Sequence, residues 1–368
     1  MTRIFFLILC LGFVAACDSG GGDVLQAPTD EATDPDGGDG SDNGDSSDGD
    51  DDTPIESDRE LPPGTESPTA SNAIVRREPR DAGGNGYANS YRYNADDDTF
   101  FVDGLGFDGD QPDGQRYTRS TPFGNLGPYA LYEAPPTFPD SVTGTQIPQF
   151  ETRAIYGVSG SGETEFAIVR TGAYINYGFG GFIYQRNGEV TLPSEGQGTY
   201  SGPYAALRDF NGRGGLEYAT GQATVDIDFS AFRGNCTPPE CDNAVRGRIT
   251  NRRIFLPDGT DITGDYLDAL GVSNEATFQN MPVLTFFIGD GVADLNGENV
   301  GTLLSGSGDP GVDQTNNLPS GAYYAVMAGD HTSLPGGEIV GIIVTETDDP
   351  RQPGVTERET GGFIAVRQ

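Results

Sequence analysis

Two residue types are missing from this 368-residue sequence, and a third occurs only once. The chain has no tryptophan and no lysine, so all 21 of its basic residues are arginines. The absence of lysine excludes a Schiff-base lysine and the lysine of a phosphate-binding P-loop. His331 is the only histidine, so any catalytic triad would have to use it. Because glycines and a proline lie close to His331, we expect it in a solvent-exposed loop.

The common catalytic motifs are also missing. No Gly-x-Ser-x-Gly sequence occurs, and the glycine-rich stretches lack the strand-then-helix context that phosphate binding needs. The single Asp-Ser-Gly begins at Asp18, beside Cys17, where an aspartic-protease core cannot form. Acidic residues are so numerous that the sequence cannot single out a general acid and base. We therefore expect a non-enzymatic protein without a cofactor or metal site, and an extracytoplasmic hydrolase is the alternative.

Positive charge is scarce in this chain. The 21 basic residues stand against 56 acidic ones, which gives a formal net charge of −35 at pH 7. Such acidity argues against binding to nucleic acid and to anionic membrane surfaces. It favours basic partners, cations or simple solubility in salt.

The acidic residues are concentrated near the N-terminus. Between residues 18 and 72 the chain carries 17 acids, one base and no aromatic residue. This composition cannot bury enough apolar surface to offset its ordering entropy, so we expect residues 17–86 to form a disordered acidic tether. Calcium binding is the alternative, because Asp-x-Asp-Gly strings occur here. However, an EF-hand loop that starts at Asp34 would need Glu where the sequence has Asp45.

The one marked hydrophobic run lies at the N-terminus. Arg3 precedes the apolar residues 4–14, a run too short to span a bilayer but typical of a signal-peptide core. It ends in Val-Ala-Ala-Cys17, which is similar to the bacterial lipobox, in which the cysteine carries the acyl chains. We therefore expect a signal peptide at residues 1–16 and a palmitate-type lipid anchor at Cys17. The expected location is the outer membrane, with the inner membrane as the alternative because Asp18 follows the cysteine.

Four cysteines occur, and only two of them remain unassigned. Cys10 is removed with the signal peptide and Cys17 takes the lipid. Cys236 and Cys241 form a closely spaced pair, which in an exported protein indicates a disulfide. Closing so short a loop contributes on the order of 2 kcal/mol by the loop-entropy estimate.

Alternation of apolar and polar residues predicts a central β-hairpin. In residues 223–229, Val225, Ile227 and Phe229 share one face, and in residues 245–251 Val245 and Ile249 do the same. The opposite faces carry aspartates on the first run and arginines on the second. Antiparallel pairing would bury both apolar faces and bring opposite charges together in water.

Helical periodicity is nearly absent elsewhere, which predicts an all-β fold. Residues 87–190 read as a smaller antiparallel β region, in which residues 103–149 are mostly long loops around one or two weak strands. Residues 191–368 supply about eight strands, the number that closes into a filled antiparallel β-barrel.

Short glycine-rich motifs recur through the C-terminal region. They are Gly198-x-Tyr200-x-Gly202, residues 221–229 ending in Asp-Phe, Val245-x-Gly247-x-Ile249, residues 321–325, residues 336–341 and residues 361–365. In this order they resemble the β-barrel domain of transferrin-binding protein B and related surface lipoproteins. The resemblance covers roughly residues 190–368, and it implies that residues 87–190 play the part of the family's small β "handle".

The resemblance also implies a function in binding. Members of that family capture host or nutrient proteins, or metal and haem carriers, at the outer surface. No ligand-binding residue can be carried over to this chain, so the ligand-binding residues are unknown. We expect the partner to be a protein or a carrier-bound nutrient, and the alternative is a structural or assembly lipoprotein that binds another envelope component.

The lipid anchor can be tested by substitution. Because Cys17 is the only cysteine at a lipobox, Cys17→Ser should abolish labelling with a radioactive fatty acid and release the protein into the soluble fractions. Label that persists on the variant would contradict the lipoprotein assignment.

Overall fold

The computed structural model describes residues 61–81, 86–105, 114–140, 142–173, 175–232, 244–287, 292–306 and 318–368. These residues belong to one compact unit of the chain, residues 50–368. Strands make up almost all of its regular structure, which confirms the predicted all-β fold. The described ranges contain two helices, α1 (Phe229–Phe232) and α2 (Thr263–Asn274), and no helix in them is long and apolar enough to cross a membrane. Cys17, Cys236 and Cys241 lie outside the described residues, so the lipid anchor and the disulfide remain predictions.

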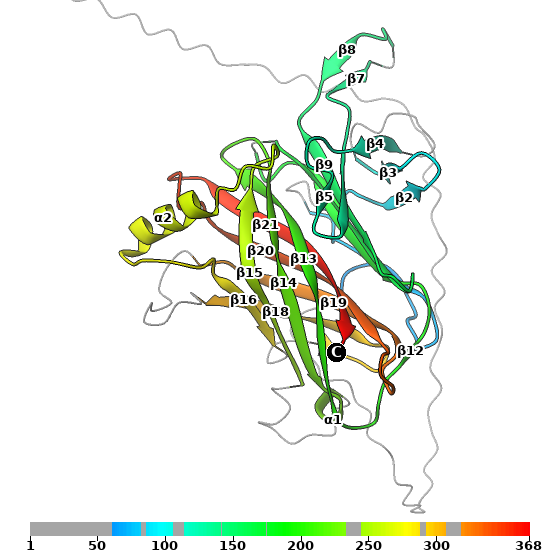
Figure 1. The fold of residues 1–368 in the computed structure, drawn as a ribbon. Coiled ribbons are helices and arrows are strands. Elements are labelled where there is room, and N and C mark those ends of the chain that lie inside the picture. Colours follow the sequence, from blue (N-terminus) through cyan, green and yellow to red (C-terminus); the bar gives the residue numbers. More distant parts are fainter. Residues whose placement is uncertain are drawn as a thin grey trace, which may run out of the picture. The chain divides into compact units, whose positions relative to one another are not determined.

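The predicted eight-stranded barrel is confirmed, and it closes without a crossover (Figure 1). Each strand pairs antiparallel with the next along the chain, and the last pairs back with the first, so that Tyr204 faces Phe363. Two short strands, β12 (Val190–Thr191) and β17 (Val292–Ala293), pair with its β19 and β18. The eight strands are β13 (Gln197–Asn211), β14 (Glu217–Asp228), β15 (Val245–Phe255), β16 (Val283–Phe287), β18 (Glu298–Gly306), β19 (Ser320–Asp330), β20 (Glu338–Asp348) and β21 (Thr356–Arg367).

The central hairpin has the predicted orientation. Ile227 lies opposite Val245 in the β14–β15 pairing, and both side chains are buried in the barrel core. Arg248, one of the alternating arginines, is exposed on the outer face. Phe229 is buried as expected, but it begins α1 instead of ending the strand.

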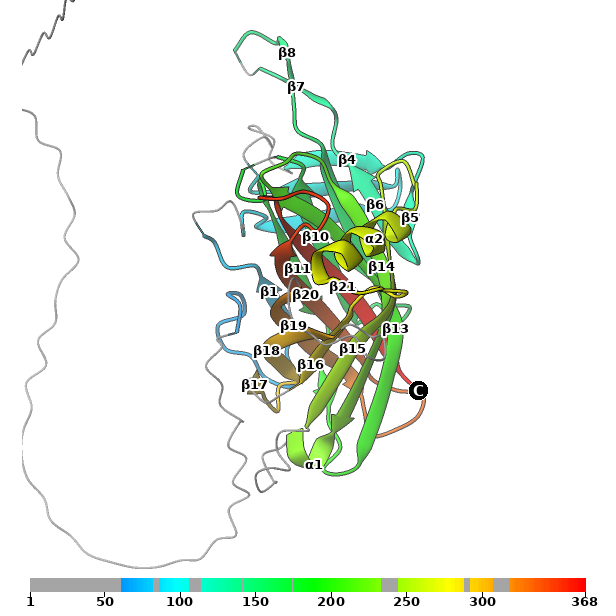
Figure 2. The same cartoon turned by 90° about the vertical axis from the view of Figure 1, so that its left-hand side faces the viewer.

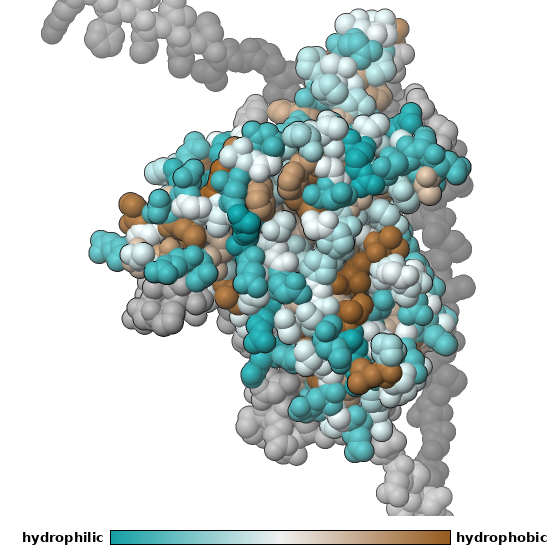
Figure 3. All heavy atoms as spheres, viewed as in Figure 1, coloured by the Kyte–Doolittle hydropathy of each residue, from teal (hydrophilic) through white to brown (hydrophobic). Residues whose placement is uncertain are grey.

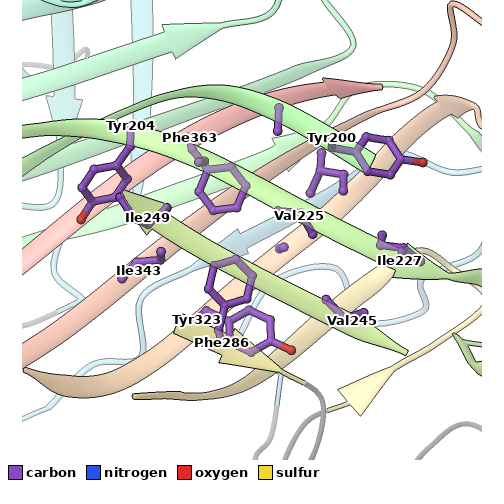
Figure 4. Close-up of a cluster of buried hydrophobic side chains, with 14 of the residues drawn as sticks. Tyr200, Tyr204, Val225, Ile227, Val245, Ile249, Phe286, Tyr323, Ile343 and Phe363 are labelled. Carbon is purple, nitrogen blue, oxygen red and sulfur yellow. The ribbon is translucent and has the colours of Figure 1, made fainter. Parts of the chain in front are cut away.

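Aromatic side chains fill the interior of the barrel (Figure 4). The Phe286 ring lies 4.6 Å from the Tyr323 ring and 6.3 Å from the Phe363 ring, measured between centroids. Gly247 makes room for this cluster, because a Cβ atom there would lie 1.9 Å from the Phe286 ring. The barrel is therefore a packed core, as expected for eight strands.

Buried charges occupy the barrel end that carries α2. The Arg208 guanidinium contacts three carboxylates, at 2.6 Å from Glu217, 2.5 Å from Glu357 and 3.4 Å from Glu359. Tyr266 of α2 donates a hydrogen bond of 2.5 Å to Glu357, and Arg208 lies 4.8 Å from the centre of the Tyr266 ring. The helix is thereby attached to the barrel through a charged network.

A second antiparallel sheet precedes the barrel, and we call it the handle sheet. In spatial order it contains β1 (Ile74–Arg77), β11 (Gly180–Arg186), β10 (Thr164–Thr171), β9 (Thr152–Val158), β6 (Tyr129–Glu133), β4 (Gln115–Arg119), β3 (Thr99–Asp103) and β2 (Ser90–Asn94), and β5 (Asn125–Leu126) pairs with β6. A separate hairpin, β7 (Thr137–Pro139) and β8 (Gln146–Pro148), is inserted between β6 and β9.

The handle sheet differs from the sequence prediction in two ways. Its strand β1 comes from the segment that we assigned to the acidic tether, because Ile74 is buried in the core and Arg76 pairs with Glu298, 222 residues further on. In addition, residues 103–149 contain β4 to β8 instead of one or two weak strands, since these strands are short and lack clear alternation. The part of the tether before residue 61 lies outside the described residues.

The handle sheet packs against the outer face of the barrel, mainly over β13, β19, β20 and β21 (Figure 2). Its inner face and the barrel wall share one apolar core, in which Ile168 and Phe182 from the handle sheet meet Leu207 and Ile342 from the barrel. The two sheets are therefore joined by a continuous buried surface.

The two faces of the central hairpin predict opposite effects of substitution. Ile227→Asp would bury an unpaired carboxylate, which costs several kcal/mol, roughly the whole stability of an ordinary domain. Arg248→Ala removes at most a surface ion pair, worth roughly 0–1 kcal/mol. Urea unfolding of both variants measures the difference, and a tolerated Ile227→Asp would mean that the barrel register is shifted by one residue.

Candidate functional site

The hairpin β7–β8 extends beyond the end of the handle sheet (Figure 1). In its pairing, Phe138 lies opposite Ile147. Asp140 organises the turn, because its carboxylate accepts hydrogen bonds from the backbone N–H groups of Val142, at 3.1 Å, and Thr143, at 2.6 Å. These bonds lower the pKa of Asp140, with the backbone N–H of Thr143 as the largest cause.

Large apolar side chains are exposed at this end of the handle sheet. Among the described residues, ten large apolar side chains are exposed, and five of them lie here. We call these five the distal patch: Val142 at 90% exposure, Ile147 at 44%, Phe150 at 45%, Ile175 at 60% and Phe179 at 43%. Three come from the β7–β8 segment and two from the loop between β10 and β11.

The two segments of the distal patch are held together at their base. Phe138 and Phe179 line the same small cavity of about 30 Å³, which is the size of a single water molecule. The backbone N–H of Gly172 donates to the carbonyl of Glu151, at 2.6 Å, which links the β10–β11 loop to the chain that follows the hairpin. In Figure 3 the hairpin stands out from the surrounding surface. The five exposed side chains therefore lie on two segments that are joined at their base, and apolar side chains exposed at one end of a domain can form an interaction site.

The handle sheet that carries the patch is fixed to the barrel by its tyrosine and arginine side chains. Arg76 makes a two-point ion pair with the buried Glu298, at 2.5 and 2.7 Å. Arg186, which is fully buried, donates to two backbone carbonyls from the barrel side, those of Asn296 at 2.6 Å and Met327 at 3.0 Å.

Tyr129 of β6 reaches the line along which the barrel closes. Its hydroxyl donates to the carbonyl of Pro203 in β13, at 2.8 Å, and accepts from the backbone N–H of Ile364 in β21, also at 2.8 Å. Proline has no N–H group for the ladder. The Tyr129 hydroxyl thus makes hydrogen bonds to both β13 and β21, the two strands whose pairing closes the barrel.

His331 is buried, and our prediction of a solvent-exposed loop residue is wrong. It has no exposed surface, and its Nδ1 lies 2.5 Å from the Tyr200 hydroxyl inside the barrel. Gly337 permits this packing, since a Cβ there would lie 2.4 Å from the ring. Burial lowers the pKa of His331 to about 4. Its role in the described structure is therefore to fill and close one barrel end.

The sequence did not predict the distal patch. The only signal was the density of prolines and aromatic residues at 135–150, which is compatible with loops as well as with a stiff hairpin. Within the described residues, no group of three or more His, Cys, Asp or Glu side chains is arranged to hold a metal ion.

Known proteins show similarity to this chain only at the level of structure. No protein-family profile and no curated protein matches it. A mutant of transferrin-binding protein B from Haemophilus parasuis is similar over 80% of this chain and 45% of its own length, with 12% identity and a TM-score of 0.33. This chain thus spans less than half the length of that protein.

Two further solved structures are similar. An intact transferrin-binding protein B with N and C lobes matches 82% of this chain and 61% of its own, with 12% identity and a TM-score of 0.31. A structure described as a surface lipoprotein matches 58% of this chain and 80% of its own, with 11% identity and a TM-score of 0.27. All three TM-scores are below 0.5, and these matches assign no ligand and no residue role to this chain.

The Tyr129 hydroxyl provides a test of how the two sheets depend on each other. Tyr129→Phe leaves the buried N–H of Ile364 without its partner, which should cost about 1–3 kcal/mol in urea unfolding. Tyr132→Phe is the matched control, because its hydroxyl bonds to Asp98, whose side chain is 44% exposed and can turn to water. Equal losses in the two variants would contradict a special role for Tyr129.

Proposed function

We propose that this chain is a lipid-anchored protein of the bacterial envelope that binds a protein ligand through the distal patch and catalyses no reaction. The observation that carries the proposal is the exposure of five large apolar side chains on one braced end of the handle sheet. Exposed apolar patches on a folded domain mark protein–protein interaction sites.

The packing of the barrel supports an external binding surface. Tyr200, Tyr323, Phe286 and Phe363 pack together in the interior. We therefore expect a ligand to bind on the outside of the two sheets. Of the ten large apolar side chains that are exposed in the described residues, five belong to the distal patch.

The N-terminal sequence supports placement at the envelope. The lipobox at Cys17 would anchor the chain, and we favour the outer membrane. The residues between Cys17 and Leu61 reach at most about 150 Å when fully extended. Such a tether leaves the distal patch free to meet a ligand away from the lipid surface.

The patch can be tested by site-specific cross-linking. A photoreactive residue at Val142, in the lipidated protein on intact cells, should cross-link one defined protein from the growth medium or the host fluid. The same residue at Val272 is the control, because Val272 is 81% exposed and lies on α2, away from the patch.

Affinity for the captured protein then tests the apolar contact. The triple variant Val142→Ser, Ile147→Ser, Phe150→Ser should bind at least about tenfold more weakly, because it removes three of the five apolar side chains. Val158→Ser with Val272→Ser should bind normally, since both valines are exposed elsewhere. Unchanged binding by the triple variant, with an unchanged unfolding midpoint, would refute the proposal. Capture of an envelope component instead would indicate the assembly role.

A further inference from the structure

A second binding feature lies at the junction of the two sheets, away from the distal patch. A pocket of about 390 Å³ opens between the chain that follows β1 and the outer face of β19 and β20. This volume falls in the range of small-molecule sites. Its lining residues are Glu78, Pro79, Asp81, Phe182, Ser320, Gly321, Ala322, Tyr324, Val344 and Glu346.

The ionisable groups of the pocket lining are all acidic. Glu78, Asp81 and Glu346 line the pocket, and no basic residue does so. Two arginines lie behind it, where Arg170 contacts Glu78 at 2.9 Å and Arg358 contacts Asp209 at 2.7 Å. The groups that line the pocket are therefore predominantly negative, and the two guanidinium groups lie behind this lining.

Among the carboxylates that line the pocket, Glu78 has one oxygen without a hydrogen-bond donor in the described residues. Its side chain is only 8% exposed, and one carboxylate oxygen, Oε1, accepts a hydrogen bond from Arg170. The other oxygen, Oε2, is buried and has no hydrogen-bond partner in the part of the chain that the structure describes. A buried carboxylate oxygen without a donor is unfavourable, and a ligand that brings a donor would satisfy it.

Glu346 extends the acidic surface to the pocket rim. Its side chain is exposed. Partial desolvation, together with the charges of Asp209 and Asp81, raises its pKa, and Arg358 opposes this rise. A positive charge in the pocket would relieve the repulsion among these carboxylates.

The remaining walls of the pocket are apolar and aromatic. The rings of Phe182 and Tyr324 lie 5.5 Å apart between centroids, and Val344 and Ala322 complete the wall. Aliphatic carbons pack well against such side chains, and an aromatic face attracts a cation. The pocket therefore combines an acidic floor and rim with a surface for a hydrocarbon stem.

We propose that this junction pocket binds an organic cation, a guanidinium or primary ammonium group on a short aliphatic stem. The cationic head would donate to Glu78 and Glu346, and the stem would lie along Phe182, Tyr324 and Val344. The same chemistry is offered by a free amine and by an arginine or lysine side chain of a bound protein. The pocket extends the function beyond the distal patch and does not depend on it.

Calorimetric titration of the full chain with agmatine and with putrescine tests the proposal. Saturable binding is expected, weakened at least about tenfold by Glu346→Gln and by Glu78→Gln, and weakened by added salt. Glu346→Gln is the decisive variant, because its exposed side chain can be changed without disturbing the fold. Glu195→Gln, an exposed acid outside the pocket, should leave binding unchanged.

Titrations with other compounds determine whether the ligand must be charged and whether it comes from a protein or a free amine. N-butylurea, which has a similar stem without charge, should not bind. If a Gly-Arg-Gly peptide binds at least tenfold more tightly than agmatine, the natural source is a protein side chain, and the reverse order indicates a free amine. The proposal is overturned by absence of saturable binding at millimolar agmatine, by binding that Glu346→Gln leaves unchanged, or by calcium binding at the same carboxylates in place of the amines. None of these outcomes bears on the distal patch.

Discussion

Pairing of β21 with β13 closes the barrel, and the rest of the structure depends on this pairing. Closure leaves none of the eight strands with a free edge, which protects the sheet against pairing with other chains. The line of closure is irregular near Pro203, because proline offers no N–H group and Gly202 brings its backbone close to Ile364. Tyr129 of the handle sheet supplies the hydrogen bonds at this point. The handle sheet is therefore part of what completes the barrel.

Arginine makes this arrangement possible in a chain without lysine. A guanidinium group has five donors in a fixed plane, so one buried arginine can contact several acceptors at once. Arg208 contacts three carboxylates at the barrel end, and Arg186 binds backbone carbonyls between the two sheets. The flexible ammonium group of lysine would match these planar sets of acceptors less well. Replacing a whole buried pair by apolar residues is often neutral for stability, whereas removing one partner alone is strongly destabilising.

The features that the sequence predicted are those encoded locally. The alternation of Val225 and Ile227 identifies the inner face of β14, because side chains in a strand alternate with a period of two. The features that it missed depend on residues far away in the chain. The loop composition around His331 suggests exposure, yet Tyr200, 131 residues earlier, holds the ring inside. The strand β1 is likewise defined by β11 and by Glu298, which no local pattern in an acidic segment can reveal.

The two candidate sites differ in the same way in how well the sequence could predict them. The distal patch had a faint local signal in its prolines and aromatic residues. The junction pocket had none, since its walls come from the chain that follows β1 and from β11, β19 and β20. Both lie on the outside, because the barrel uses its interior for packing. A filled barrel joined to a second sheet gives a rigid support, and rigidity lowers the entropy cost of binding. Because side chains fill the interior of the barrel, the candidate binding sites lie on surfaces that the handle sheet forms.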